Sequence, residues 1–395
     1  MSSQLLRMLL CLAAFLSLIA AVNLVANPYG AWPVTLIDRT YLRVAVGDER
    51  LATPYRARAE SPAVLLIGTS RILYGMWIEQ GYRDGVLNAG LSGATIDEVG
   101  VLLDLALRNP RLQRIIWTVD FQLFSETHKG FADRPTYDRL AGDLPRQVRE
   151  TLFSTDALRR SGSVLLRAVG GRARLPTDRL RPVPWPPSAL REELEAIEAS
   201  GSNGPHGART EQHLRDWLEA FGRQRRSPEQ WALFRRAVQR VRARGVDLTV
   251  LVAPLSVYEL EAIRQSGAWS DFVEWKRELA SITPYWDFSG YNAVAMHDAL
   301  YTFPIFCHFK APVGHALLRG LLGEDCRDCG PLAQALIESG VWVEPGTVDA
   351  HLAAQETARE QLAASSPRYS PLIAKISGIA GQGSSPASVS ANGGG

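Results

Sequence analysis

The chain has 395 residues, a length that predicts about two or three domain units rather than one small domain. Hydrophobic residues make up 46% of the chain and charged residues 21%, so the composition excludes a protein that is disordered throughout. With 43 basic and 41 acidic side chains the net charge is only +2, which excludes a strongly basic nucleic-acid binder, so we expect no nucleic-acid partner. Four cysteines are too few for a scaffold built from disulfides.

An apolar run lies near the N-terminus. Residues 8–25 read MLLCLAAFLSLIAAVNLV, and at 1.5 Å per residue this run spans about 27 Å, close to the thickness of a bilayer core. A cleaved signal peptide and a buried core helix are the alternatives, although the apolar part of a signal peptide is usually shorter. Because Arg7 precedes the run and no second run is as long, we predict one inner-membrane span in residues 1–26, with the bulk in the periplasm.

The next segments alternate between strands and helices. Residues 27–62 are interrupted by prolines and predict a linker. The elements predicted after it are strands 63–67, 86–88 and 114–119, a helix 96–107 with a Thr95–Glu98 capping box, helix 231–244, strand 247–253, helix 257–282, strand 284–288 and helix 313–322. Strands that are apolar throughout predict an α/β domain over residues 63–323, with a parallel sheet covered on both faces.

Two regions break this rhythm. Residues 121–227 are rich in Arg, Pro and Gly, and we interpret them as an inserted, partly helical lid that follows the third strand. Residues 324–395 drift into Ala, Ser and Gly, which predicts a C-terminal extension that is largely disordered.

Cys326 and Cys329 form a lone C-x-x-C pair. A zinc site requires a second pair or histidines at ligand spacing, so we predict no metal site. In an oxidising compartment we expect a disulfide between two of Cys307, Cys326 and Cys329, with a redox motif as the alternative.

Polar residues follow the predicted strands where ligands bind in parallel sheets. Ser70 comes directly after the first strand, where its hydroxyl could act as a nucleophile and its N–H could hold an oxyanion; alternatively it caps the next helix. Gly90 follows the second strand and offers a second N–H, or forms an ordinary turn. His308 precedes the last helix as a candidate general base, or is a surface imidazole.

In this order the three residues resemble the SGNH/GDSL hydrolase superfamily. Within it, the chain is most similar to membrane-anchored SGNH-like proteins associated with bacterial exopolysaccharide acylation, which share the blocks Asp120–Phe124 and Trp286–Asn292. The resemblance implies a three-layer, flavodoxin-like fold with Ser70 as nucleophile and His308 as catalytic base. It also implies an oxyanion hole formed by the N–H groups of Ser70 and Gly90.

The sequence departs from the superfamily at two points. Ile305 stands where an acid usually precedes the histidine, so Asp298 is our candidate for that acid and Asp287 is the alternative. The third block usually supplies an Asn side chain to the oxyanion hole, whereas Val119, Asp120 and Phe121 stand there in this chain, and a carboxylate at the oxyanion would repel developing negative charge.

The resemblance therefore implies a periplasmic acetyl esterase or O-acetyltransferase that acts on cell-surface or exported polysaccharide without a cofactor. Other exopolysaccharide-system proteins are expected partners. The alternative is a catalytically inactive component that binds polysaccharide or assists its assembly, since tryptophan and arginine side chains suit sugar rings and uronates. A lipase or peptidase has no support beyond the fold. The enzyme requires Ser70 Oγ and His308 to lie within hydrogen-bonding distance.

Overall fold

The computed structural model describes residues 3–34, 36–37, 49–76, 85–130, 143–170, 187–200, 208–302 and 307–383. At its centre is a six-stranded sheet with the order β2-β1-β3-β4-β5-β6. The strands are β1 (Val64–Ile67), β2 (Val86–Asn88), β3 (Arg114–Thr118), β4 (Asp247–Val252), β5 (Tyr285–Asp287) and β6 (Val341–Val343). β1 to β5 pair in parallel and β6 is antiparallel to β5, so the predicted α/β class with a mostly parallel sheet is confirmed.

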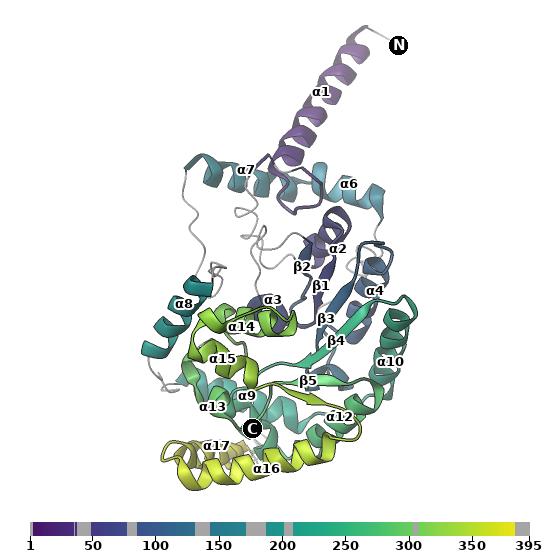
Figure 1. Ribbon diagram of the computed structural model, residues 1–395. Helices are drawn as coiled ribbons and strands as arrows, with labels where there is room; N and C mark the ends of the chain where they lie inside the picture. The colour runs from purple at the N-terminus through teal and green to yellow at the C-terminus, as the bar shows by residue number, and fades with distance from the viewer. Residues whose placement is uncertain are drawn as a thin grey trace, which may run out of the picture.

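Helices cover both faces of this sheet (Figure 1). They are α1 (Ser3–Ala26), α2 (Glu49–Glu60), α3 (Ser70–Gly75), α4 (Ile96–Ala106), η2 (Phe121–Phe124), α6 (Leu144–Leu152), α7 (Thr155–Gly170), α8 (Pro187–Ala199), α9 (Ala208–Gly222), α10 (Pro228–Ala243), α11 (Val257–Gln265), α12 (Trp269–Ile282), α13 (Ala293–Met296), η3 (Asp298–Leu300), α14 (Ala311–Leu321), η4 (Arg327–Cys329), α15 (Pro331–Glu338), α16 (Val348–Ser365) and α17 (Tyr369–Gly383). On one face α4 packs against α10, and on the other α3 packs against α14.

The core strands are buried because they carry apolar side chains on both faces. β1 and β3 lie in register from Val64 opposite Arg114 to Ile67 opposite Trp117. The predicted capping box of α4 is present, with Thr95 and Glu98 each bonded to the other's backbone N–H. The single helix predicted over 257–282 is instead two, α11 and α12, since Gly267 between them has a φ of +84°, which a helix cannot contain.

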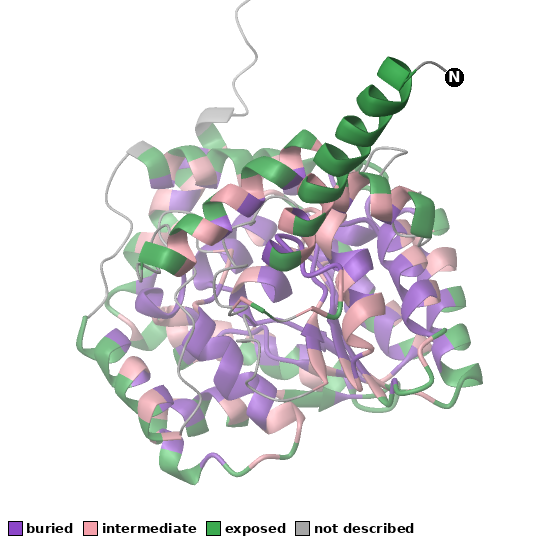
Figure 2. Ribbon diagram, turned by 90° about the horizontal axis from the view of Figure 1, so that it is seen from above, coloured by how far each residue is buried: buried purple, intermediate pink, exposed green. Residues whose placement is uncertain are grey.

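The N-terminal helix α1 is long and apolar enough to span a membrane. It projects from the domain and is exposed over most of its length (Figure 2). Its last turns contact α6 and α7, where Asn23 and Ala26 are buried.

The predicted linker contains a helix. Within the described part of residues 27–62, α2 packs against α4, and its Arg50 lies 2.7 Å from Glu98. Tyr55 on the same helix is fully buried. The sequence pattern did not predict this helix, because α2 is rich in polar residues. It contacts the domain through ion pairs as well as apolar packing.

The described parts of the insert are helical and contain no strand, and β3 is adjacent to β4, so the sheet is contiguous without the insert. α9 packs against α11, whereas α6 and α7 contact α1. The insert is therefore not a lid alone. Its Pro-rich stretch 182–186 lies outside the described residues.

The prediction of a largely disordered C-terminal extension is wrong for residues 331–383. This segment forms α15, β6, α16 and α17, and β6 extends the sheet. The segment adds apolar side chains to the core, including Leu336, Val343 and Ile376, and α16 also docks through polar side chains, which an apolar pattern cannot reveal. Its His351 and Gln355 bond the buried Asp287, which is also 2.7 Å from Lys276.

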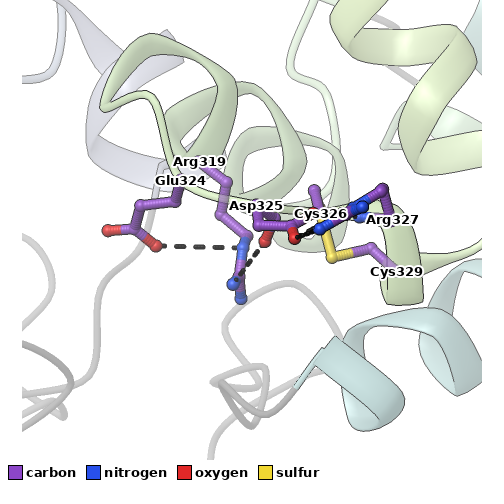
Figure 3. The surroundings of a disulfide bond; sticks show 6 residues. All are labelled: Arg319, Glu324, Asp325, Cys326, Arg327 and Cys329. Atoms are coloured by element: carbon purple, nitrogen blue, oxygen red, sulfur yellow. Dashed lines mark hydrogen bonds and ion pairs between the residues drawn. A yellow bond between two sulfur atoms is a disulfide. The ribbon is translucent and has the colours of Figure 1, made fainter.

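The expected disulfide is confirmed as Cys326–Cys329, between α14 and α15. Figure 3 shows Arg319 beside it, where its guanidinium donates to the Asp325 carbonyl (2.9 Å). Cys307 is a free thiol.

Candidate active site

Ser70 lies at the carboxyl edge of the sheet. β1 ends at Ile67, and Thr69 then caps α3 by accepting a hydrogen bond from the Arg71 N–H. Thr69, not Ser70, is therefore the capping residue. Ser70 is the first residue of α3, where the helix supplies no acceptor for the Ser70 N–H.

His308 is brought to Ser70 by the segment that precedes α14. An antiparallel bridge between Tyr301 and Phe309 closes this segment, and the Thr302 N–H donates to the His308 carbonyl (2.8 Å). The His308 Nε2 atom lies 2.8 Å from Ser70 Oγ. The ring of Tyr74 meets the imidazole edge to face, with ring centroids 5.3 Å apart. The two predicted residues are thus within hydrogen-bonding distance, although 238 positions separate them.

Two glycines allow close contact between α3, which carries Ser70, and α14, which follows His308. A Cβ on Gly314 of α14 would lie 1.9 Å from the carbonyl oxygen of Gly75 in α3. No side chain fits in that space, so the close crossing of α3 and α14 requires glycine at position 314. This crossing fixes the separation between the start of α3 and the start of α14.

A buried ion cluster lies beside the pair. Arg71 Nε is 2.7 Å from Asp120 Oδ1, its Nη2 binds Glu259, and its Nη1 donates to the Cys307 carbonyl (2.6 Å). The Thr69 hydroxyl also donates to Asp120. The concern that the Asp120 carboxylate would repel an oxyanion is therefore corrected: Arg71 and Thr69 already bind it, which offsets its charge.

Burial and neighbouring charges shift the pKa values of the groups in and beside this cluster. Desolvation lowers the pKa of Arg71, but Glu259 and Asp120 outweigh it, so the pKa is raised and the guanidinium stays charged. Burial raises the pKa of Glu259, which Arg71 only partly opposes, and Glu259 Oε2 is buried without a hydrogen-bond partner. Burial also raises the pKa of the Cys307 thiol to about 12, so this thiol stays protonated at neutral pH.

Gly90 differs from the expectation. Its N–H donates to Asn88 Oδ1 (3.0 Å), so in this structure it is committed to a side chain rather than directed at an oxyanion. A Cβ at position 90 would lie 2.6 Å from Ile72 Cγ2 and 2.7 Å from the Leu73 nitrogen. The physical reason for glycine here is the close approach of this loop to α3.

The two candidate acids occupy other networks. Asp298 is buried and accepts hydrogen bonds from the Tyr258 hydroxyl (3.2 Å) and from Arg368. Asp287 binds Lys276 and α16, as described above. Near the other ring nitrogen of His308, the structure places Cys307 Sγ at 3.5 Å from Nδ1. Ile305 lies outside the described residues.

A cavity of about 130 Å³ opens beside the pair. Ser70, His308, Asp120 and Glu259 line its polar side. Thr69, Arg71, Gln122 and His128 also line it, and most of the remaining wall is apolar and largely aromatic, formed by residues including Phe121, Trp217, Phe221, Leu255, Ile263, Phe272 and Trp275. Trp217 and Phe221 belong to α9, so the insert contributes part of the wall.

Sequence reasoning missed the roles of Arg71 and Glu259. Arg71 follows Ser70 directly, and its position next to a candidate nucleophile was the available signal. Glu259 carried no such signal, because Ser256-x-x-Glu259 reads as an ordinary capping box. The Glu259 N–H indeed bonds Ser256, but the Glu259 carboxylate turns to Arg71.

In the described part of the chain, no three His, Cys, Asp or Glu side chains are grouped so that they could hold a metal ion. The chain matches no protein-family model and no curated protein. The geometry of the site is therefore the basis for a functional assignment.

Proposed function

We propose that this chain is a membrane-anchored SGNH-type enzyme that transfers or hydrolyses an O-acyl group, with acetyl esters of exported or cell-surface polysaccharide as substrates. The observation that carries the proposal is the 2.8 Å separation of Ser70 Oγ and His308 Nε2 at the carboxyl edge of a parallel sheet. The polysaccharide and the polysaccharide-system partners rest on the resemblance of the sequence blocks.

The proposed reaction has two steps. Ser70 Oγ attacks the acyl carbonyl carbon while His308 Nε2 takes the hydroxyl proton, and the ester C–O bond then breaks as His308 returns the proton to the leaving oxygen. Water or a glycan hydroxyl next attacks the acyl carbon of the acyl-serine and gives its proton to His308; the acyl C–Oγ bond then breaks as His308 returns that proton to Ser70 Oγ. The Ser70 N–H at the start of α3 is a donor for the oxyanion in both steps.

The ion cluster beside the pair supports this chemistry through its charge and its hydrogen bonds. The Arg71 guanidinium binds both Asp120 and Glu259, so it offsets negative charge beside the position of the oxyanion. The bond from Arg71 to the Cys307 carbonyl also holds the backbone next to His308.

We further propose that the domain lies in the periplasm. Arg7 lies near the start of α1, on the N-terminal side of the apolar run 8–25, and the Cys326–Cys329 disulfide is typical of an oxidising compartment.

One observation favours the alternative, an inactive polysaccharide-binding component. The Gly90 N–H bonds Asn88 Oδ1, so one of the two expected oxyanion donors is engaged elsewhere. Loss of one such donor typically lowers kcat by about 10²–10³.

The test is turnover of p-nitrophenyl acetate and of an acetylated polysaccharide by the purified full-length protein. We expect Ser70→Ala and His308→Ala each to lower kcat by at least about 10³, and the double variant to be no worse than either, because the two residues act as a unit. Mass spectrometry should detect an acyl adduct on Ser70.

Ser227→Ala is the matched control, because Ser227 also stands at the start of a helix and caps α10. It should cost about 1 kcal/mol of stability and leave turnover unchanged. Equal activity of wild type, Ser70→Ala and His308→Ala would exclude the enzyme and leave the binding component.

A further inference from the structure

A surface separate from the candidate active site lies at the C-terminal end of α1. The helices α6 (Leu144–Leu152) and α7 (Thr155–Gly170), together called the α6–α7 platform, contact α1 near its C-terminal end and run across beneath it (Figure 1). Asn23 Nδ2 donates to the Leu152 carbonyl (2.8 Å), and Ser161 Oγ donates to Asn23 Oδ1 (2.7 Å). Hydrogen bonds with both platform helices therefore fix α1 to this surface.

The platform stands at a defined height along α1. Residues 3–18 are exposed, Ile19 is the first partly buried residue, and Asn23 is the first that is buried. The part of α1 before Asn23 spans about 30 Å, which equals the thickness of a bilayer core. A bilayer that contains this part of α1 would end at the level of the platform, so the platform is at the height of the lipid headgroups.

The two sides of α7 differ in chemistry. One side packs on the domain: Ala157 is buried in a cluster with Tyr29 and Tyr55, and on the same side the Tyr29 hydroxyl donates to Asp156 Oδ2 (2.6 Å) and the Arg160 guanidinium lies over the Tyr29 ring. Leu158 and Val169 fall roughly 160–180° around the helix from Arg160. The apolar strip of α7 therefore faces away from the domain, on the side toward which α1 extends.

These apolar side chains are exposed. Leu166 is 77% exposed, Val169 88% and Leu144 of α6 55%. On α6, Glu150 faces the domain, since it accepts a hydrogen bond from the Tyr55 hydroxyl (2.8 Å), and Val148 lies on the opposite side. Both helices thus present apolar side chains away from the domain.

Charge also suits a lipid surface. Residues 143–170 carry five arginines and three carboxylates, and Arg159 at the edge of α7 is exposed. An apolar strip flanked by arginine is the composition of helices that lie in the membrane interface, where arginine binds anionic headgroups.

We propose that the α6–α7 platform lies in the headgroup layer of the bilayer that α1 spans, with Leu144, Leu158, Leu166 and Val169 in contact with the lipid and anionic phospholipid as the partner. The continuity of this strip with the exposed part of α1 is what assigns lipid rather than a protein to it. The domain is then held at a fixed height and orientation by three helices, not tethered by one. This inference rests on the membrane anchor of the proposed function and not on its acyl chemistry.

The test uses the full-length protein in vesicles of phosphatidylcholine and phosphatidylglycerol. Leu166→Trp and Val169→Trp each add a reporter, and the fluorescence of the parent, with its ten tryptophans, is subtracted. Ala354→Trp is the matched control, because it is an exposed position on α16, at the opposite end of the molecule from α1 (Figure 1).

Lipids brominated at acyl positions 6 and 7 should quench the added fluorescence of either platform variant by roughly half, because interfacial helices insert only to a shallow depth. Bromines at positions 11 and 12 should quench less, and the control should not respond. Circular dichroism verifies that each variant is folded. Quenching no stronger than in the control would overturn the proposal and assign the strip to a protein partner. Stronger quenching by the deeper bromines would also contradict it.

Discussion

Arg71 is the residue on which the largest number of site contacts depends. Its guanidinium binds two carboxylates and one backbone carbonyl while it is only 8% exposed. A buried charge of this kind contributes mainly through what its loss would leave behind. Without Arg71, Asp120 and Glu259 would be two buried carboxylates with no cation.

We therefore predict that Arg71→Met lowers the free energy of unfolding by about 3–5 kcal/mol, measured by urea denaturation. The triple variant with Asp120→Asn and Glu259→Gln should recover part of this loss, because it removes the uncompensated charges. Arg191→Met is the control, since Arg191 pairs with Glu195 on the exposed surface and should have little effect. An unchanged urea midpoint for Arg71→Met would contradict this account of the cluster.

Among the elements, the crossing of α3 and α14 determines whether Ser70 and His308 meet. The two helices approach until the Gly75 carbonyl occupies the space that a side chain at position 314 would need. The contact is between backbones, so neither side can yield by changing a rotamer.

We predict that Gly314→Ala destabilises the protein by about 1–3 kcal/mol or more, although alanine favours a helix over glycine. It should also separate Ser70 from His308. The kcat for ester hydrolysis should therefore fall even at temperatures at which the variant stays folded. The control is Gly162→Ala in α7, where no atom lies within 4 Å of the added Cβ. That change should be neutral or stabilising by up to about 1 kcal/mol. Equal melting temperatures for Gly314→Ala and Gly162→Ala would contradict the view that the α3–α14 crossing requires glycine at position 314.

At the scale of the whole molecule, the buried Asp287 carboxylate on β5 joins the C-terminal extension to the sheet, because it accepts hydrogen bonds from α16. Burial alone would raise its pKa, but Lys276 and His351 outweigh burial and hold the pKa far below the usual range. Since the folded pKa is depressed, this carboxylate stabilises the fold at pH values above its unfolded pKa of about 4. The stabilisation is lost as the pH falls below that value.

We predict that between pH 6 and 3 the free energy of unfolding falls more steeply for the wild type than for Asp287→Asn. The variant should be less stable at pH 7, because Lys276 is then buried without its anion. Chemical denaturation across this range measures both effects, and hydrogen exchange should show α16 detaching first in the variant. Parallel pH curves for the two proteins would argue against Asp287 as the fastening group.

The sequence alone determined the α/β class, because five apolar strands alternate with amphipathic helices and periodicity records which faces are buried. It also located the capping box at Thr95 and the helix that can span a membrane. Ser70 and His308 could be named in advance, since residues at strand ends and before helices fall at one edge of a parallel sheet. These features are local, or follow from the geometry of parallel strands.

Tertiary structure decided the rest, because the remaining features are interactions between distant polar residues. The pairing of Arg71 with Glu259 and the commitment of the Gly90 N–H to Asn88 leave no periodic signal. The C-terminal extension is ordered by pairing of β6 with β5, by scattered apolar contacts and by hydrogen bonds from α16 to Asp287, none of which its Ala- and Ser-rich composition reveals. Apolar burial is recorded in the pattern of one segment, whereas a buried polar network is defined only when the segments that supply its donors and acceptors are brought together.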